Sequence, residues 1–132
     1  MKLTYMLDTD SVSFALRGQG RVAARILEHR PSEICISAIT LAELRYGAAR
    51  RKSAKLHDLI DAFTANVAVV PFDEVCASQF GAVAAELAER GSPIGEYDAL
   101  IAAHAVALEL TLVTNNVKRF TRVAGLHVEN WF

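Results

Sequence analysis

The stretch LTYMLDTDSV, residues 3–12, joins an apolar run to two closely spaced acids. Residues 3–7 have the composition of a buried strand. Asp8 ends that run, and Asp10 follows two positions later. A carboxylate at the end of a buried strand costs free energy unless it caps a helix, is paired, or holds a cation. The remainder of the chain must therefore supply the reason for these acids.

The composition is that of a single folded domain, 1–132. Of the 132 residues, 52% are hydrophobic and 22% are charged, which excludes a disordered chain. The formal net charge of −1 does not by itself indicate a nucleic-acid-binding protein. Local basic patches could still bind nucleic acid, because the arrangement of charge matters more than its sum. The sequence contains no apolar run long enough for a membrane span and no recognisable secretory signal. We therefore expect a cytoplasmic protein that does not enter a membrane.

Short strand-like runs alternate with longer helical segments along the whole chain. Strands are expected at 3–7, 33–37, 67–72 and 111–114, with a possible edge strand at 126–130. Helices are expected at 11–16, 21–29, 40–51, 55–66, 73–90 and 96–110. This alternation predicts an α/β fold with a parallel β-sheet flanked by helices on both faces, a three-layer sandwich. In such sheets, functional sites form beyond the carboxyl ends of the strands.

Polar residues occur where this site edge is expected. Asp8 follows the first strand, and Asp10 is the better candidate for the cap of the next helix. Glu43 lies among apolar neighbours in the helix after the second strand, where a solvated surface residue is the ordinary alternative. Thr114 and Asn116 end the fourth strand, although Asn is also a common turn residue.

Asp98 lies in the first turn of an otherwise apolar helix, and Glu96 precedes it by two residues. The helix dipole favours an anion there by about 0.3–1 kcal/mol, which is a sufficient structural reason for either acid. However, the carboxyl ends of the strands and the start of this helix can converge on one edge of the sheet. Two carboxylates about 4 Å apart repel by roughly 4 kcal/mol at an effective dielectric of 20. A cluster of acids there predicts a bound Mg²⁺ or Mn²⁺ ion, which prefers oxygen ligands.

Four segments in this order resemble the PIN-domain ribonucleases, in particular the VapC toxins of bacterial toxin–antitoxin pairs. They are MLDTDSVSF (6–14), ISAITLAELRYGA (36–48), PIGEYDALIAAHAVALELTLVTNNVKRF (93–120) and GLHVENWF (125–132). The resemblance implies a PIN-like fold and a Mg²⁺-dependent endoribonuclease, with Mn²⁺ as the other possible metal. It also implies a VapB-type antitoxin partner, a homodimer, and a toxin–antitoxin hetero-oligomer.

The resemblance assigns roles residue by residue. Asp8, Glu43 and Asp98 match the acids that hold the metal, which would activate water for hydrolysis of an RNA phosphodiester bond. Thr114 and Asn116 would hydrogen-bond to water or phosphate at the metal. Asn116 stands where many PIN domains have a fourth acid, which suggests a weaker second metal site. Two further departures are Asp10, where the family more often has Asn, and Arg119, where relatives with NNTREF have Glu.

Two basic segments are the expected RNA contacts. RYGAARRKSAK supplies Arg45, Arg50 and Arg51, and VKRFTR supplies Lys118 and Arg119. Each of these residues alone is an ordinary solvated cation, but two clusters near an acidic site are reasonable contacts for RNA phosphates. The family suggests a structured RNA such as tRNA as the substrate.

Two alternatives remain open at the level of sequence. A PIN-like module without catalytic activity would act only by binding a partner, although all three acids are retained. A phosphatase of the haloacid dehalogenase type would use LDTDSV as its opening motif. Such an enzyme also needs a later Lys and an acidic pair, whereas Lys118 is the sole Lys after Asp98 and no Asp follows it. Self-association is expected because the run from Ala99 to Leu110 and the helices at 21–29 and 55–66 offer more apolar surface than a small sheet needs.

Overall fold

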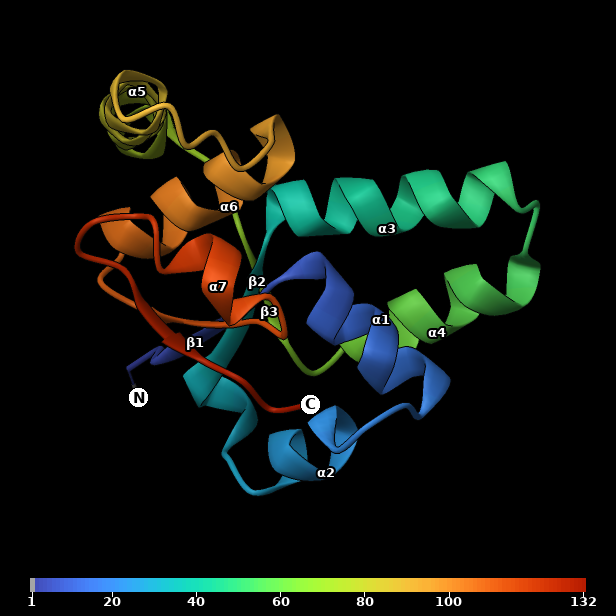
Figure 1. Ribbon diagram of the computed structural model, residues 1–132. Helices are drawn as coiled ribbons and strands as arrows, with labels where there is room; N and C mark the ends of the chain where they lie inside the picture. The colour runs from blue at the N-terminus through green and yellow to red at the C-terminus, as the bar shows by residue number, and fades with distance from the viewer. Residues whose placement is uncertain (1) are drawn as a thin grey trace.

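The protein is described here by a computed structural model covering residues 2–132, and its centre is a five-stranded sheet (Figure 1). All strand pairs are parallel, and the order across the sheet is β3-β2-β1-β4-β5. The strands are β1 (Tyr5–Leu7), β2 (Ile34–Ser37), β3 (Ala68–Val70), β4 (Thr111–Val113) and β5 (His127–Glu129). Each lies within a segment predicted as a strand, and β5 is at the edge as expected.

Seven α-helices occur within the described residues, along with one 3₁₀ turn at Pro31–Glu33. The helices are α1 (Thr9–Arg17), α2 (Val22–Leu27), α3 (Ala38–Arg50), α4 (Ala54–Thr64), α5 (Glu74–Glu89), α6 (Glu96–Ala107) and α7 (Val117–Phe120). The first six match the predicted helices to within a few residues at each end. Helix α7 was missed, because its basic sequence was interpreted as a turn.

Helices cover both faces of the sheet because side chains alternate along each strand. Met6, Cys35 and Leu112 point to one face, where they pack in a core with α5 and α6. Leu7 and Val113 point to the other face, where they pack with α1, α3 and α4. Figure 1 shows α5 and α6 together on one side and α1 and α4 on the other. The predicted three-layer sandwich is confirmed.

The apolar residues of α6 are mostly buried within the monomer. Ala99, Ile101, Ala102, Ala103, His104 and Ala105 are all buried in the described chain. The argument for self-association from this run is therefore wrong, because most of that surface already packs within the sandwich. The homodimer stays a prediction. Within residues 2–132, every helix is too short or too polar to cross a lipid bilayer.

The order of the strands creates a switch point between β1 and β4. From β1 the chain moves outward to β2 and β3, and it then returns to place β4 on the opposite side of β1. Ligands in open α/β sheets bind at the carboxyl ends of the strands at such a point. Asp8 N–H donates to the Val113 carbonyl at 3.0 Å, so the residues that follow β1 and β4 lie together there.

Candidate active site

Asp8 is a buried carboxylate at this switch point. Its side chain is 4% exposed, and its Oδ1 accepts a hydrogen bond from Ser11 N–H at 2.8 Å. Asp8 is therefore the N-cap of α1, and the prediction that Asp10 would be the cap is wrong. The helix begins at Thr9, two residues earlier than predicted, so the acid that ends the strand also caps the helix. Asp10 is an exposed residue of the first turn.

Burial raises the pKa of Asp8 from 3.8 to about 6, and the nearby charge of Asp10 adds to the increase. Hydrogen bonds from Thr114 and Ser11 oppose that rise in the pKa without cancelling it. Thr114 is fully buried beside this carboxylate. A buried acid with a raised pKa is a group whose charged form lacks full compensation, and such groups concentrate at functional sites.

Glu43 is brought to the same edge by α3, which begins directly after β2. Thr9 Oγ1 donates a hydrogen bond to Glu43 Oε1 at 2.6 Å and lies 3.3 Å from Thr40 Oγ1. Burial raises the pKa of Glu43, the Thr9 hydroxyl lowers it, and the charges of Asp98 and Asp10 raise it further. The sequence analysis did not predict this contact of Thr9 with Glu43. The one available signal was that Thr9 lies between Asp8 and Asp10.

Asp98 lies in the first turn of α6, as predicted, and is partly exposed. Arg119 Nη1 donates to Asp98 Oδ2 at 2.7 Å, and the same nitrogen reaches the Ile94 carbonyl at 3.2 Å. Arg119 was predicted to contact RNA, and its ion pair with Asp98 was not anticipated. Glu96 is exposed at the start of the same helix.

Thr114 and Asn116 connect β4 to α7. Thr114 Oγ1 accepts from Asn116 N–H at 3.0 Å, and Asn116 Oδ1 accepts from Arg119 N–H at 3.4 Å as the cap of α7. Asn116 thus fixes the position of the residue that binds Asp98. The sequence placed both residues correctly at the end of the fourth strand, but α7 gives Asn116 a structural role as well.

The acids converge, although their side chains do not form a closed ligand cage. The charges of Asp98 and Asp10 raise the pKa of Glu43, and the charge of Asp10 raises the pKa of Asp8, so these acids lie within range of one another's charge. Within residues 2–132, however, no three Asp, Glu, His or Cys side chains are arranged to hold one metal ion. The donor chemistry fits Mg²⁺ or Mn²⁺, because carboxylate oxygens are the ligands these ions prefer. Asp98 would have to exchange Arg119 for such an ion.

The predicted RNA contacts separate into different environments. Arg45 bonds the Asp61 carboxylate and the His57 carbonyl of α4, so it belongs to the packing of α3 on α4. Arg50 is exposed at the far end of α3. Arg51 lines a hollow of about 280 Å³ that Thr9, Asp10 and Glu43 also border.

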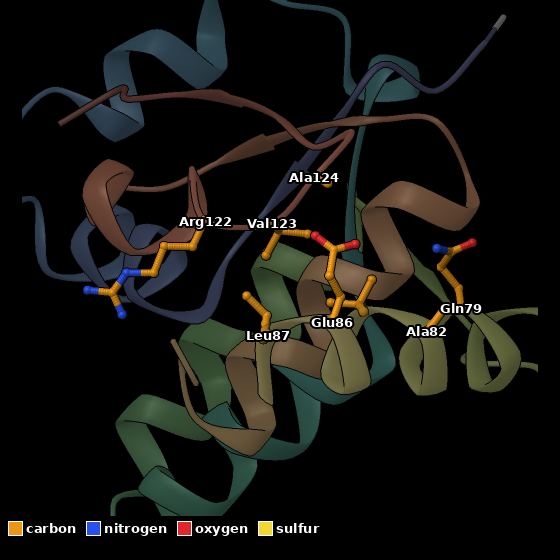
Figure 2. A pocket seen from close by; sticks show the side chains of 8 residues that line it. Gln79, Ala82, Glu86, Leu87, Arg122, Val123 and Ala124 are labelled. Carbon is orange, nitrogen blue, oxygen red and sulfur yellow. The ribbon is translucent and has the colours of Figure 1, made fainter. Parts of the chain in front are cut away.

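Lys118 and Arg119 line a second, basic hollow of about 220 Å³ together with Arg122 and Asn116. Arg122 also borders a small pocket of about 70 Å³ between α5 and residues 122–124 (Figure 2). Figure 2 shows Leu87 and Glu86 of α5 on one side of that pocket and Val123 on the other. It contains none of the candidate catalytic acids, so the hollows that border Glu43 or Arg119 are the relevant surfaces.

The fold and the convergent acids define an acidic site of the nuclease type on a doubly wound sheet. Residues 5–126 match the PIN domain, and the chain belongs to the PIN-domain family. Within that family its relatives are VapC proteins, which sets aside the phosphatase alternative.

Two of these relatives span the chain almost completely. The tRNA(fMet)-specific endonuclease VapC of Salmonella typhimurium is 35% identical over 130 residues, covering 98% of each chain. Ribonuclease VapC2 of Rickettsia felis is 37% identical over 132 residues, again covering 98% of each. The crystal structure of VapBC2 from Rickettsia felis, bound to a DNA fragment from the promoter, matches with a TM-score of 0.90 at 36% identity and covers 100% of both chains.

Proposed function

We propose that this protein is an endoribonuclease toxin of a toxin–antitoxin pair, that it hydrolyses RNA phosphodiester bonds, and that a VapB-type antitoxin neutralises it. Full-length relatives named as ribonucleases, and relatives crystallised as VapBC complexes, support this proposal. The structural observation that supports it is the buried Asp8 at the switch point between β1 and β4, together with Glu43 within range of the charge of Asp98. Structured RNA, and tRNA first, is the substrate class to test, since one relative is named for tRNA(fMet).

We further propose that Asp8, Glu43 and Asp98 bind a divalent metal ion, with Mg²⁺ before Mn²⁺. When bound, the ion supplies Lewis-acid stabilisation of the phosphate and lowers the pKa of water. Asp8 contributes a desolvated carboxylate whose orientation is fixed by Ser11 and Thr114. Thr9 holds the Glu43 carboxylate in one orientation, which suits Glu43 to position the attacking water or the ion.

The remaining site residues orient the acids or contact the substrate. Thr114 orients Asp8 from its fully buried position, and Asn116 positions the Arg119 backbone at the basic hollow. Lys118, Arg119 and Arg122 offset the repulsion between the acidic centre and the RNA backbone. Hydrolysis breaks the phosphorus–oxygen bond to the leaving nucleotide and transfers the elements of water across it.

The test compares wild type with two single substitutions, at Glu96 and at Asp98, which lie two residues apart on α6. Purified protein free of antitoxin is incubated with total tRNA in Mg²⁺, in Mn²⁺ and in EDTA. We expect discrete fragments from wild type and from Glu96→Gln with metal, and none from Asp98→Asn. Glu96→Gln is the matched control, because it removes an exposed acid from the same turn.

Each outcome bears on a different part of the proposal. Cleavage by wild type in EDTA would overturn the metal requirement, and wild-type cleavage by Asp98→Asn would overturn the site. A folded wild-type protein that leaves tRNA and other cellular RNA intact with either metal would favour the catalytically inert binding module.

A further inference from the structure

Two large aromatic side chains are exposed next to the catalytic acids. Tyr46 is 69% exposed and Tyr97 is 59% exposed. Tyr46 lies one helical turn after Glu43 on α3, so both residues are on one face of that helix. Tyr97 directly precedes Asp98 on α6. The helices that deliver two of the acids therefore also present two unburied aromatic rings beside them.

These rings border a single hollow of about 480 Å³. It is lined by Ala42, Glu43, Tyr46 and Tyr97, so its walls are aromatic and aliphatic with one carboxylate. No cation among residues 2–132 lines it, and the carboxylate of Glu43 would repel a phosphate group. A neutral, flat, apolar group is the ligand chemistry that fits these walls.

The basic hollow near Asp98 has the opposite character. It is lined by Asn116, Lys118, Arg119 and Arg122, with Pro93 and Ile94, and it suits an anionic phosphate. One hollow includes Glu43 and the residue before Asp98, and the other includes the arginine that binds Asp98. An aromatic surface and a cationic one therefore both adjoin the acids, and an RNA strand carries one group for each.

We propose that the hollow formed by Ala42, Glu43, Tyr46 and Tyr97 binds a nucleobase of the RNA substrate beside the cleaved bond, by stacking on the tyrosine rings. This inference rests on the proposed ribonuclease function and adds a base subsite to it. Stacking on aromatic side chains accepts any base, because every base has a flat apolar face. The subsite thus favours unpaired nucleotides, whose bases are free to leave a helix, over paired ones.

The position of Glu43 argues for a substrate rather than a second protein copy in this hollow. A protein partner seated there would cover the Glu43 carboxylate, which lines the hollow. Covering a carboxylate without giving it a cation is costly. A nucleotide that enters from solvent and leaves after cleavage keeps the site accessible between reactions.

The experiment measures binding separately from cleavage. On an Asp98→Asn background, a short fluorescent single-stranded RNA is titrated by anisotropy, together with the same strand carrying abasic sites. Tyr46→Ala and Tyr97→Ala remove the rings, Tyr46→Phe and Tyr97→Phe keep them, and Leu27→Ala is the control at an 85% exposed apolar residue elsewhere. In chains with Asp98 intact, KM and kcat are measured for the same variants.

We expect each Ala variant to bind the intact strand roughly 5- to 100-fold more weakly. The Ala variants should also lose the preference for intact over abasic RNA, and the Phe variants and Leu27→Ala should retain it. In the active chains, the loss should appear mainly in KM. Thermal melting of all variants should match that of their parents, because both tyrosines are exposed.

Three results would overturn the inference. Wild-type binding by both Ala variants would remove the base subsite while leaving the ribonuclease intact. A change from dimer to monomer in light scattering, with RNA binding unchanged, would assign the hollow to a second copy of the chain. Failure of wild type to bind or cleave any RNA would overturn the proposed function, and this inference with it.

Discussion

Arg119 Nη1 lies 2.7 Å from Asp98 Oδ2, so a cation from α7 pairs with an acid in the first turn of α6. The two residues are far apart in sequence, and the cap formed by Asn116 at the start of α7 brings them together. Arg119 is also the residue that departs from the acidic position of the NNTREF relatives. The proposed metal ion and this guanidinium therefore compete for one carboxylate.

Arg119→Ala should strengthen divalent metal binding. Removing a positive charge close to a divalent ion at a solvent-exposed site should tighten binding by roughly 2- to 10-fold. Titration calorimetry with Mg²⁺ and Mn²⁺ measures the effect, and Lys118→Ala is the matched control. The increase should disappear on an Asp98→Asn background. Equal affinities for wild type and Arg119→Ala would mean that the two cations do not compete.

Asp8→Asn should stabilise the metal-free protein at neutral pH. The folded state raises the pKa of Asp8 from 3.8 to about 6, so folding is favoured while this group is protonated, and the favourable contribution is lost as the pH rises through 6. Asn keeps the helix cap without the charge. The gain should approach, at most, about 3 kcal/mol above pH 7 and vanish near pH 4. Urea unfolding in EDTA across this range measures it, and a constant difference at all pH values would contradict the assignment.

Thr9→Val should move the acidic limb of the pH–rate profile to higher pH. The Thr9 hydroxyl donates to Glu43 and lowers the pKa of that carboxyl. Without the hydroxyl, Glu43 is protonated at a higher pH, so activity that requires its carboxylate is lost earlier on acidification. Thr9→Ser retains the donor and should keep the wild-type profile. Identical profiles for Val and Ser would show that Glu43 is not the group titrating.

Lys118→Ala and Arg45→Ala should have different effects. Lys118 lines the basic hollow, and its removal should weaken RNA binding and reduce the slope of log K against log salt by about 0.7–0.9. Arg45 is held by Asp61 and His57, so its removal should lower thermal stability slightly and leave that slope unchanged. Binding measured at several salt concentrations separates the two, and an equal loss of slope for Arg45→Ala would place it on the RNA path.

The sequence predicted the fold well because its strands are short apolar runs separated by long helices. Asp8, Thr114 and Asn116 were placed correctly since they follow β1 and β4, and parallel strands share one carboxyl edge. The ion pair of Arg119 with Asp98 was not predictable, because it depends on where α7, a helix missed in the sequence, begins after β4 and on the direction of the Arg119 side chain. Arg45 was assigned to RNA by charge alone, and its partner Asp61 lies on the next helix, where side-chain direction decides the contact.

β1 lies between β2 and β4, and Asp8 needs the Thr114 hydroxyl that follows β4. During synthesis, Asp8 leaves the ribosome well before β4 and Thr114 do. Contacts between such distant segments form late. A nascent chain that has not yet reached β4 therefore carries all three acids without the strand that completes their setting. Translation itself delays the completion of the site until β4 has been made.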